Sequence, residues 1–352
     1  MRAGSKKLTT DNAEKEGAEA RSPVLDGWRG ISILLVLIGH MAPLGPKSLK
    51  LNVMVSAAGL SIFFFLSGFL VVSMLLRNGN LVTFAIRRSL RILPLAWLVL
   101  VVVMLVQRPT AEVWIANLLF YANIAPEYLL PHADHLWSLS VEVQFYLAIA
   151  LLVAALGKRG LVVVPIACIL VTAARVANGA GFSILTWFRV DEILAGGAVA
   201  VLLPLLPRAM FTQKWSSVAR YVLVALFFLS CHPSLAWLHY ARPYAAAALI
   251  YSTMNSESGH LRTLLSSSSL SYLAKTSYAL YVIHPLTYAG WLGEGDVVVR
   301  YTKRTFSVLL TFCLAHVSSF HFEKFWNDLA HRITGVIEKR AIAQSPLRSQ
   351  PL

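Results

Sequence analysis

Long apolar runs separated by short polar loops recur along almost the whole chain. Most are long enough for a helix, tilted where necessary, to cross a hydrocarbon core of roughly 30 Å. A helix satisfies its own backbone hydrogen bonds in lipid, so the pattern predicts an all-α fold, a polytopic transmembrane helical bundle of about ten spans. The predicted spans are residues 27–44, 53–76, 90–107, 136–156, 161–177, 184–206, 219–232, 235–251, 271–292 and 305–323.

The apolar stretch 112–121 is too short to cross comfortably, and we predict a short re-entrant or interfacial segment. The distribution of Lys and Arg supports this choice. If 112–121 does not cross, the basic clusters near residues 87–91, 158–159 and 208–220 all fall on the side of the N-terminus. We therefore expect a multi-pass protein of the inner (plasma) membrane with cytoplasmic N- and C-termini.

The predicted membrane domain occupies residues 23–326, between a disordered cytoplasmic N-terminal tail (1–22) and a cytoplasmic C-terminal tail (327–352). The composition agrees with a membrane protein: 57% of the 352 residues are hydrophobic and 14% are charged, with a mean hydropathy of +0.64. A net charge of +14 could suggest nucleic acid. However, the basic residues lie mainly in loops and tails, so we expect the lipid bilayer as a partner and no nucleic acid.

The first span, within LDGWRGISILLVLIGH, contains Arg29 and His40. In a helix, these residues lie about 16 Å apart along the axis and roughly 20° from the same face. Polar groups are costly at membrane depth, so this face is expected to point into the bundle. The structural alternative is that Arg29 reaches the interface and His40 is a hydrogen-bonded core residue.

The stretch HLWSLSVEVQFY brings Glu142 into the fourth span. Ser138 and Glu142 share a helical face at i and i+4, and His135 lies one turn before Ser138. A glutamate inside the membrane must be neutral, paired or near water. A functional site is favoured over a structural ion pair.

Of two further stretches, one contains small residues and the other contains paired arginines. FFFLSGFLV contains Ser67 and Gly68, and small residues of this kind permit close helix packing. RRSLRILP places Arg88 and Arg91 at i and i+3 at the cytoplasmic mouth of the third span. Paired guanidinium groups suit phosphate recognition, although topology signals or lipid-headgroup contacts are an alternative.

The sixth and ninth spans also contain polar residues. In RVDEILAGG, pairing of Arg189 with Glu192 is the simplest explanation, and Asp191 lies beside them. SYALYVIHP contains Tyr278 and His284, followed by a proline that should bend or end the helix. Taken alone, His284 is most simply a core histidine.

The sequence contains no Gly-x-Ser-x-Gly elbow, P-loop, Rossmann glycine pattern or HExxH motif. The three cysteines, Cys168, Cys231 and Cys313, fall inside apolar runs without metal-ligand spacing. We expect no metal, no disulfide framework and no bound cofactor. A basic mouth, a histidine and a carboxylate inside the membrane could serve either acyl transfer or ion movement.

Together, LDGWRG with His40, FFFLSGFLV, RRSLRILP, HLWSLSVEVQFY, RVDEILAGG and SYALYVIHP resemble, in order and spacing, the acyltransferase 3 family of integral-membrane O-acyltransferases. The resemblance covers about residues 25–325. It implies an acyl-CoA co-substrate, with acetyl-CoA favoured, and acyl transfer to a hydroxyl of a carbohydrate or glycoconjugate. Some longer members have an appended SGNH-type esterase domain, and we expect none after the tenth span here.

Carried over residue by residue, the resemblance makes His40 and Glu142 catalytic and assigns donor binding to Arg29, Arg88 and Arg91. Two positions depart from the family pattern: Val143 stands where a second acidic residue is common, and Ala96 where an aromatic is common. Only one carboxylate is therefore assigned. The remaining polar positions form a predicted acceptor or supporting site: Ser67, His135, Trp137, Ser138, Arg189, Asp191, Tyr278 and His284.

In the resulting hypothesis, His40 removes the proton of the acceptor hydroxyl, and Glu142 orients its ring or stabilises its cation. Direct transfer is favoured over an acyl-enzyme on Ser67, Ser138 or His40. The rival functions are a proton-coupled transporter or exporter of a polar or anionic substrate, and a non-catalytic receptor or scaffold. The sequence shows no inverted repeat typical of many transporters.

Overall fold

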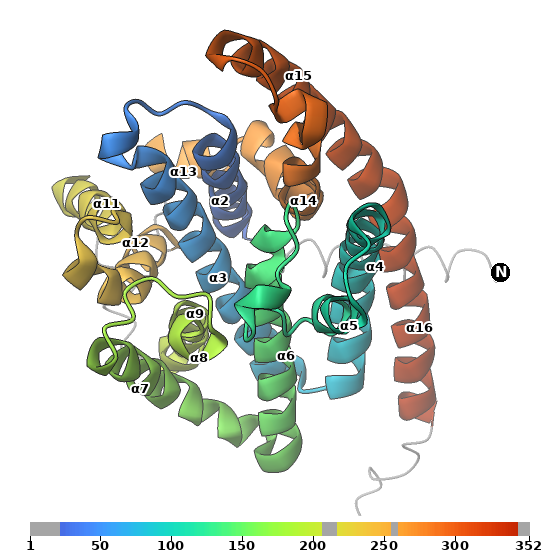
Figure 1. The fold of residues 1–352 in the computed structure, drawn as a ribbon. Coiled ribbons are helices and arrows are strands. Elements are labelled where there is room, and N and C mark those ends of the chain that lie inside the picture. Colours follow the sequence, from blue (N-terminus) through green and yellow to red (C-terminus); the bar gives the residue numbers. More distant parts are fainter. Residues whose placement is uncertain (1–21, 206–216, 255–259, 344–352) are drawn as a thin grey trace, which may run out of the picture.

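A computed structural model describes residues 22–205, 217–254 and 260–343 (Figure 1). All regular structure within these ranges is helical, which confirms the predicted all-α fold. The predicted N-terminal tail, apart from its last residue, and the basic residues between 206 and 216 lie outside the described residues. The α-helices are α2 (Pro23–Met41), α3 (Leu51–Asn78), α4 (Leu81–Gln107), α5 (Ala111–Leu118), α6 (Trp137–Leu156), α7 (Val163–Ala177), α8 (Thr186–Arg189), α9 (Asp191–Leu202), α11 (Ser217–Cys231), α12 (Arg242–Met254), α13 (His260–Leu265), α14 (Ser268–Ile283), α15 (Val297–Val317) and α16 (Glu323–Ala343).

Helix α3 lies at the centre of the bundle, between α2 and α9, and α14 packs against α2 (Figure 1). The middle turns of α3 lie in the core, where Phe64 and Phe65 are buried. The α3–α9 contact depends on two glycines. A Cβ atom on Gly68 would lie 1.8 Å from the carbonyl oxygen of Ile193, and one on Gly196 would lie 1.9 Å from that of Phe65. The predicted close packing at these small residues is confirmed.

Five helical segments are long and apolar enough to cross a membrane, judged by length and composition within the described residues. The other predicted spans contain shorter helices. For example, α9 has 12 residues and α14 has 16, so they are about 18 and 24 Å long. Helix α14 ends at Ile283, directly before His284 and Pro285, as the proline predicted. The five segments are Pro23–Met41, Lys47–Asn78, Leu81–Gln107, Asp134–Ala177 and Val297–Lys339.

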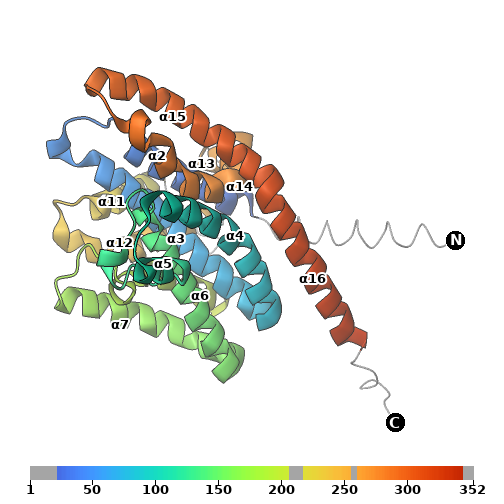
Figure 2. The same ribbon diagram turned by 45° about the vertical axis from the view of Figure 1, so that its right-hand side comes forward.

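The C-terminal part of the chain is more regular than the sequence suggested. Helix α15 continues through a π-helical turn (Ser318–Phe322) into α16, which packs along α4 (Figure 2). Arg87 on α4 donates to the Thr334 hydroxyl at 3.2 Å and lies 3.5 Å from the carboxylate of Glu338. The predicted C-terminal tail therefore begins as a helix attached to the bundle.

Candidate active site

Helix α2 positions both polar residues of the first span. It begins with Pro23, whose fixed backbone suits the first turn, and runs without a break past Arg29 and His40 to Met41. The predicted separation of about 16 Å along one helix therefore holds. Ser32 fixes α2 to α3 by donating to the carbonyl of Gly59 at 2.7 Å.

His40 opens into a cavity of about 500 Å³, which we call the outer cavity. Its walls come from α2, α3, the segment before α8, the start of α6 and α14. His135, Trp137 and Arg189 line it together with His40, so four residues predicted as site residues meet there. The His40 side chain is exposed to this space rather than enclosed in the core.

His284 is the hydrogen-bond partner of His40. The distance from His40 Nδ1 to His284 Nε2 is 2.8 Å, and the rings stack with centroids 5.1 Å apart. His284 Nδ1 lies 2.8 Å from the carbonyl oxygen of Tyr281, which can only accept, so this nitrogen bears the hydrogen. Neutral His284 then accepts at Nε2 from His40 Nδ1–H. This geometry leaves the lone pair of neutral His40 on Nε2.

A second chain of hydrogen bonds holds the start of α6 against α14. The Tyr281 hydroxyl donates to the carbonyl of His135, and the Ser138 hydroxyl donates to Tyr281 Oη at 2.6 Å. The His135 ring lies edge-on to His284, with centroids 5.2 Å apart. Ser138 is fully buried and lines neither cavity, so it fits a supporting role.

Arg29, Arg88 and Arg91 line a second, narrower space of about 60 Å³, which we call the inner cavity. The three arginines come from α2 and α4, far apart in the sequence, and their meeting was predicted. Glu142 is the one carboxylate in this lining. Tyr278 also lines the inner cavity and donates its hydroxyl to the carbonyl of Ile92.

Glu142 lies at the inner cavity, whereas the sequence hypothesis required it beside His40. Its carboxylate accepts hydrogen bonds from the hydroxyls of Ser67 and Tyr146. Arg88 in turn donates to Tyr146 Oη at 3.2 Å. Glu142 lies seven positions after His135, which is about 10 Å farther along the helix axis. The side chain that the structure places within hydrogen-bond distance of His40 is His284.

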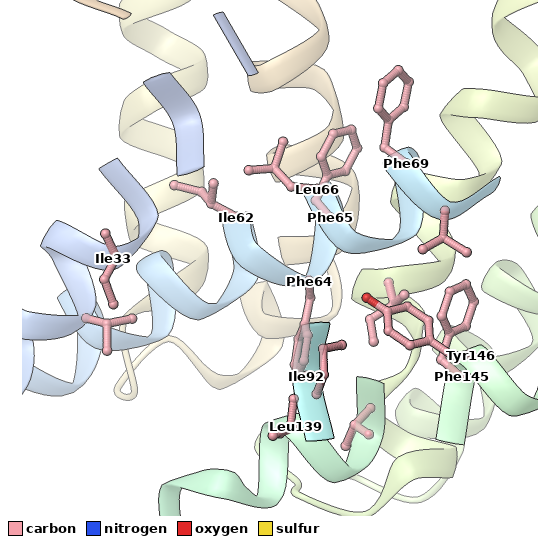
Figure 3. Close-up of a cluster of buried hydrophobic side chains, with 14 of the residues drawn as sticks. Ile33, Ile62, Phe64, Phe65, Leu66, Phe69, Ile92, Leu139, Phe145 and Tyr146 are labelled. Atoms are coloured by element: carbon pink, nitrogen blue, oxygen red, sulfur yellow. The ribbon is translucent and has the colours of Figure 1, made fainter. Parts of the chain in front are cut away.

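The apolar packing around this network is dense (Figure 3). Tyr146 lies beside Phe145 on α6 with its hydroxyl pointing toward α3. Phe64, Ile92 and Leu139 pack close together from three different helices. Polar groups enclosed in this way keep their hydrogen bonds because nothing else can solvate them.

The two cavities adjoin along α2. Val36, Leu60 and Tyr281 line both, so these three side chains lie between the two cavities. The arginines line one cavity and His40 lines the other. Tyr281 is one polar residue of the apolar stretch SYALYVIHP, and its position at the junction depends on the tertiary packing of α14.

A cluster of buried charged residues adjoins the outer cavity through Arg189. Arg189 approaches Glu192 at 3.1 Å, which confirms the predicted pair. Arg242 donates to the same carboxylate oxygen at 2.6 Å, and Arg175 donates to Asp191. Arg175 and Arg242 were missed as site residues. Each is the one charged residue deep in its apolar run, which was the available signal.

Among the described residues, no group of three or more His, Cys, Asp or Glu side chains is arranged to hold a metal ion.

A family model described as an acyltransferase domain matches residues 23–324, which is most of the chain. The protein therefore belongs to this family of acyltransferases, and its apolar helices make it a membrane protein. A Staphylococcus aureus (strain COL) protein named "Putative O-acetyltransferase" is 24% identical over an alignment of 308 residues; the match covers 74% of this chain and 50% of that protein. Nodulation protein 10 of Rhizobium leguminosarum bv. viciae is 29% identical over an alignment of 125 residues; the match covers 29% of this chain and 34% of that protein.

The chain thus spans about half or less of the length of these curated relatives. No solved structure matched the fold significantly.

Proposed function

We propose that this acyltransferase moves an acyl group, with acetyl favoured, from acyl-CoA to a hydroxyl of a carbohydrate or glycoconjugate. One observation carries this proposal: two adjoining cavities place three arginines at one end and an oriented histidine at the other. The name of the Staphylococcus aureus relative supports acetyl as the acyl group.

The inner cavity is the proposed donor end. Arg29, Arg88 and Arg91 bring three positive charges against the single carboxylate of Glu142, a balance that favours the phosphates of coenzyme A. The axial distance of about 16 Å from Arg29 to His40 is similar to the reach of an extended pantetheine arm. The thioester can then lie near His40 while the phosphates stay at the arginines.

His40 is the proposed general base. Its Nε2 lone pair, fixed by the bond from Nδ1 to His284, takes the proton of the acceptor hydroxyl. The hydroxyl oxygen attacks the thioester carbonyl carbon, the C–S bond breaks, and the proton passes from the imidazolium to the thiolate of coenzyme A. Ser67 and Ser138 line neither cavity and are hydrogen-bonded, which supports direct transfer over an acyl-enzyme on either serine.

We further propose ten crossings of the plasma membrane, with cytoplasmic termini and the arginine end on the cytoplasmic side. The positions of the basic loops support this orientation. Helix α5 has eight residues, a length of about 12 Å, which supports a re-entrant or interfacial segment rather than a crossing.

The test is thiol release from acetyl-CoA by the purified full chain in detergent, with and without envelope glycans as acceptors. Glycan-dependent release is expected for the wild type and not for His40→Ala. Glycan-dependent release that persists in detergent, where there is no membrane potential, distinguishes an acyltransferase from a transporter. If folded His40→Ala released thiol as fast as the wild type, the role of His40 would be contradicted. If added glycan did not increase thiol release by the wild type, the proposed reaction would be contradicted.

A further inference from the structure

Arg189 is a buried cation in the wall of the same cavity into which His40 opens. Its residue exposure is 2%, and its guanidinium lies over the rings of Trp137 and Phe64, at 5.6 and 5.7 Å from their centroids. The proposed reaction gives this side chain no task, because the donor phosphates are bound at the inner cavity.

The ionic cluster that contains Arg189 has more positive than negative charge. Asp191 is neutralised by Arg175, and both side chains are fully buried. Glu192 is shared: one of its oxygens lies 2.6 Å from Arg242 and 3.1 Å from Arg189. Three guanidinium groups therefore face two carboxylates, and one positive charge is left over.

Arg189 is the member of the cluster that lines the cavity, and two of its three guanidinium nitrogens lack hydrogen bonds to the part of the chain that the structure describes. Its Nε and Nη1 atoms have no hydrogen-bond partner among the described residues. The approach of Nη1 to Glu192 is close in distance but does not satisfy the angles of a hydrogen bond. Buried guanidinium groups ordinarily have their N–H donors satisfied, so one that shares its carboxylate with a second arginine and leaves Nε and Nη1 without hydrogen bonds beside a cavity points to an anionic ligand.

We propose that Arg189 binds an anionic group of the acceptor in the outer cavity, so that the acceptor is an acidic sugar or a sugar phosphate. This inference rests on the proposed function, which places the acceptor hydroxyl at His40 in the same cavity. A carboxylate and a phosphate offer the same chemistry to a guanidinium group. The first would come from a uronic acid of a glycan and the second from a phosphorylated, lipid-linked sugar.

Binding to the purified full chain tests the proposal without acyl transfer. Three probes are titrated calorimetrically in detergent: methyl glucuronide, glucose 1-phosphate and the neutral methyl glucoside. We expect at least one anionic probe to bind roughly 10- to 100-fold more tightly than the glucoside, the effect of a charge-assisted hydrogen bond. The anionic probe that is preferred identifies the source of the anion. Equal binding of all three probes overturns the proposal.

Arg189→Gln should abolish the preference for the anionic probe. The matched control is Arg300→Gln, which removes the same charge from an exposed position in the first turn of α15. Arg189→Gln also leaves the cluster with balanced charges, so it should unfold at no lower temperature than the wild type. A retained preference overturns the proposal, as does a lost preference accompanied by a large fall in unfolding temperature.

Two more variants keep the outcomes separate. Where Arg189→Gln does not accumulate, Arg189→Lys retains the charge and should retain the preference; a folded Lys variant that binds all probes equally overturns the proposal. His40→Ala should lose acyl transfer but still prefer the anionic probe. Anion binding without any transfer by the wild type would contradict the proposed function and leave the anion site standing.

Discussion

Replacement of His284 tests whether the orientation of the His40 ring governs catalysis. His284 is fully buried, and its Nε2 lies 2.8 Å from His40 Nδ1. In the proposed reaction His40 becomes a cation, so this bond becomes charge-assisted and worth about 1.5–3 kcal/mol. At about 1.4 kcal/mol for each factor of ten, His284→Phe should reduce kcat by roughly 10- to 100-fold. The KM for acyl-CoA should not change, because the arginines of the inner cavity are untouched.

His284→Gln is the matched variant, since a glutamine amide oxygen can accept from His40 Nδ1 where phenylalanine cannot. The assay is initial rates of acetyl transfer over a range of acetyl-CoA and acceptor concentrations, with thermal unfolding as the check on folding. Glutamine should restore part of the lost kcat. A Phe variant within about twofold of the wild-type kcat, or a Gln variant no faster than Phe, would refute the orienting role.

Three other changes test separate parts of the structure. Arg91→Gln should raise the KM for acetyl-CoA roughly tenfold or more by removing a phosphate contact, with the KM for the acceptor unchanged; the reverse pattern would place the donor elsewhere. Gly68→Ala forces α3 away from α9 and should lower stability by about 1–3 kcal/mol, measured as thermal unfolding in detergent; an unchanged unfolding temperature would contradict that contact. Asp191→Asn leaves Arg175 buried without its partner and should cost about 3–5 kcal/mol in the same assay, whereas a neutral effect would show that the pair is dispensable.

The features that a single helix determines could be predicted from the sequence. The spacing of Arg29 and His40 follows from helix geometry, and α2 has it. The close approach at Gly68 and Gly196 follows from small residues in apolar runs, and the end of α14 follows from Pro285.

The features that depend on how helices meet could not be predicted from one sequence. Whether Glu142 or His284 reaches His40 depends on the rotation and depth of α6 and α14 beside α2, which no periodicity specifies. The partners of Asp191 and Glu192 similarly come from α7 and α12, so the excess positive charge near Arg189 is visible only after packing. The helix is also interrupted inside a predicted span, for example at Val190, which lies between α8 and α9.

The central claim is that the protein transfers an acyl group from acyl-CoA to a glycan hydroxyl, with His40 as the general base. The most direct measurement is mass spectrometry of surface glycans and secreted glycosides from a strain of the source organism that lacks the gene, complemented with the wild type or with His40→Ala. We predict that one acyl modification disappears in the deletion strain, returns with the wild type and stays absent with His40→Ala at equal membrane abundance. Identical acylation in all strains, or full restoration by His40→Ala, would contradict the claim.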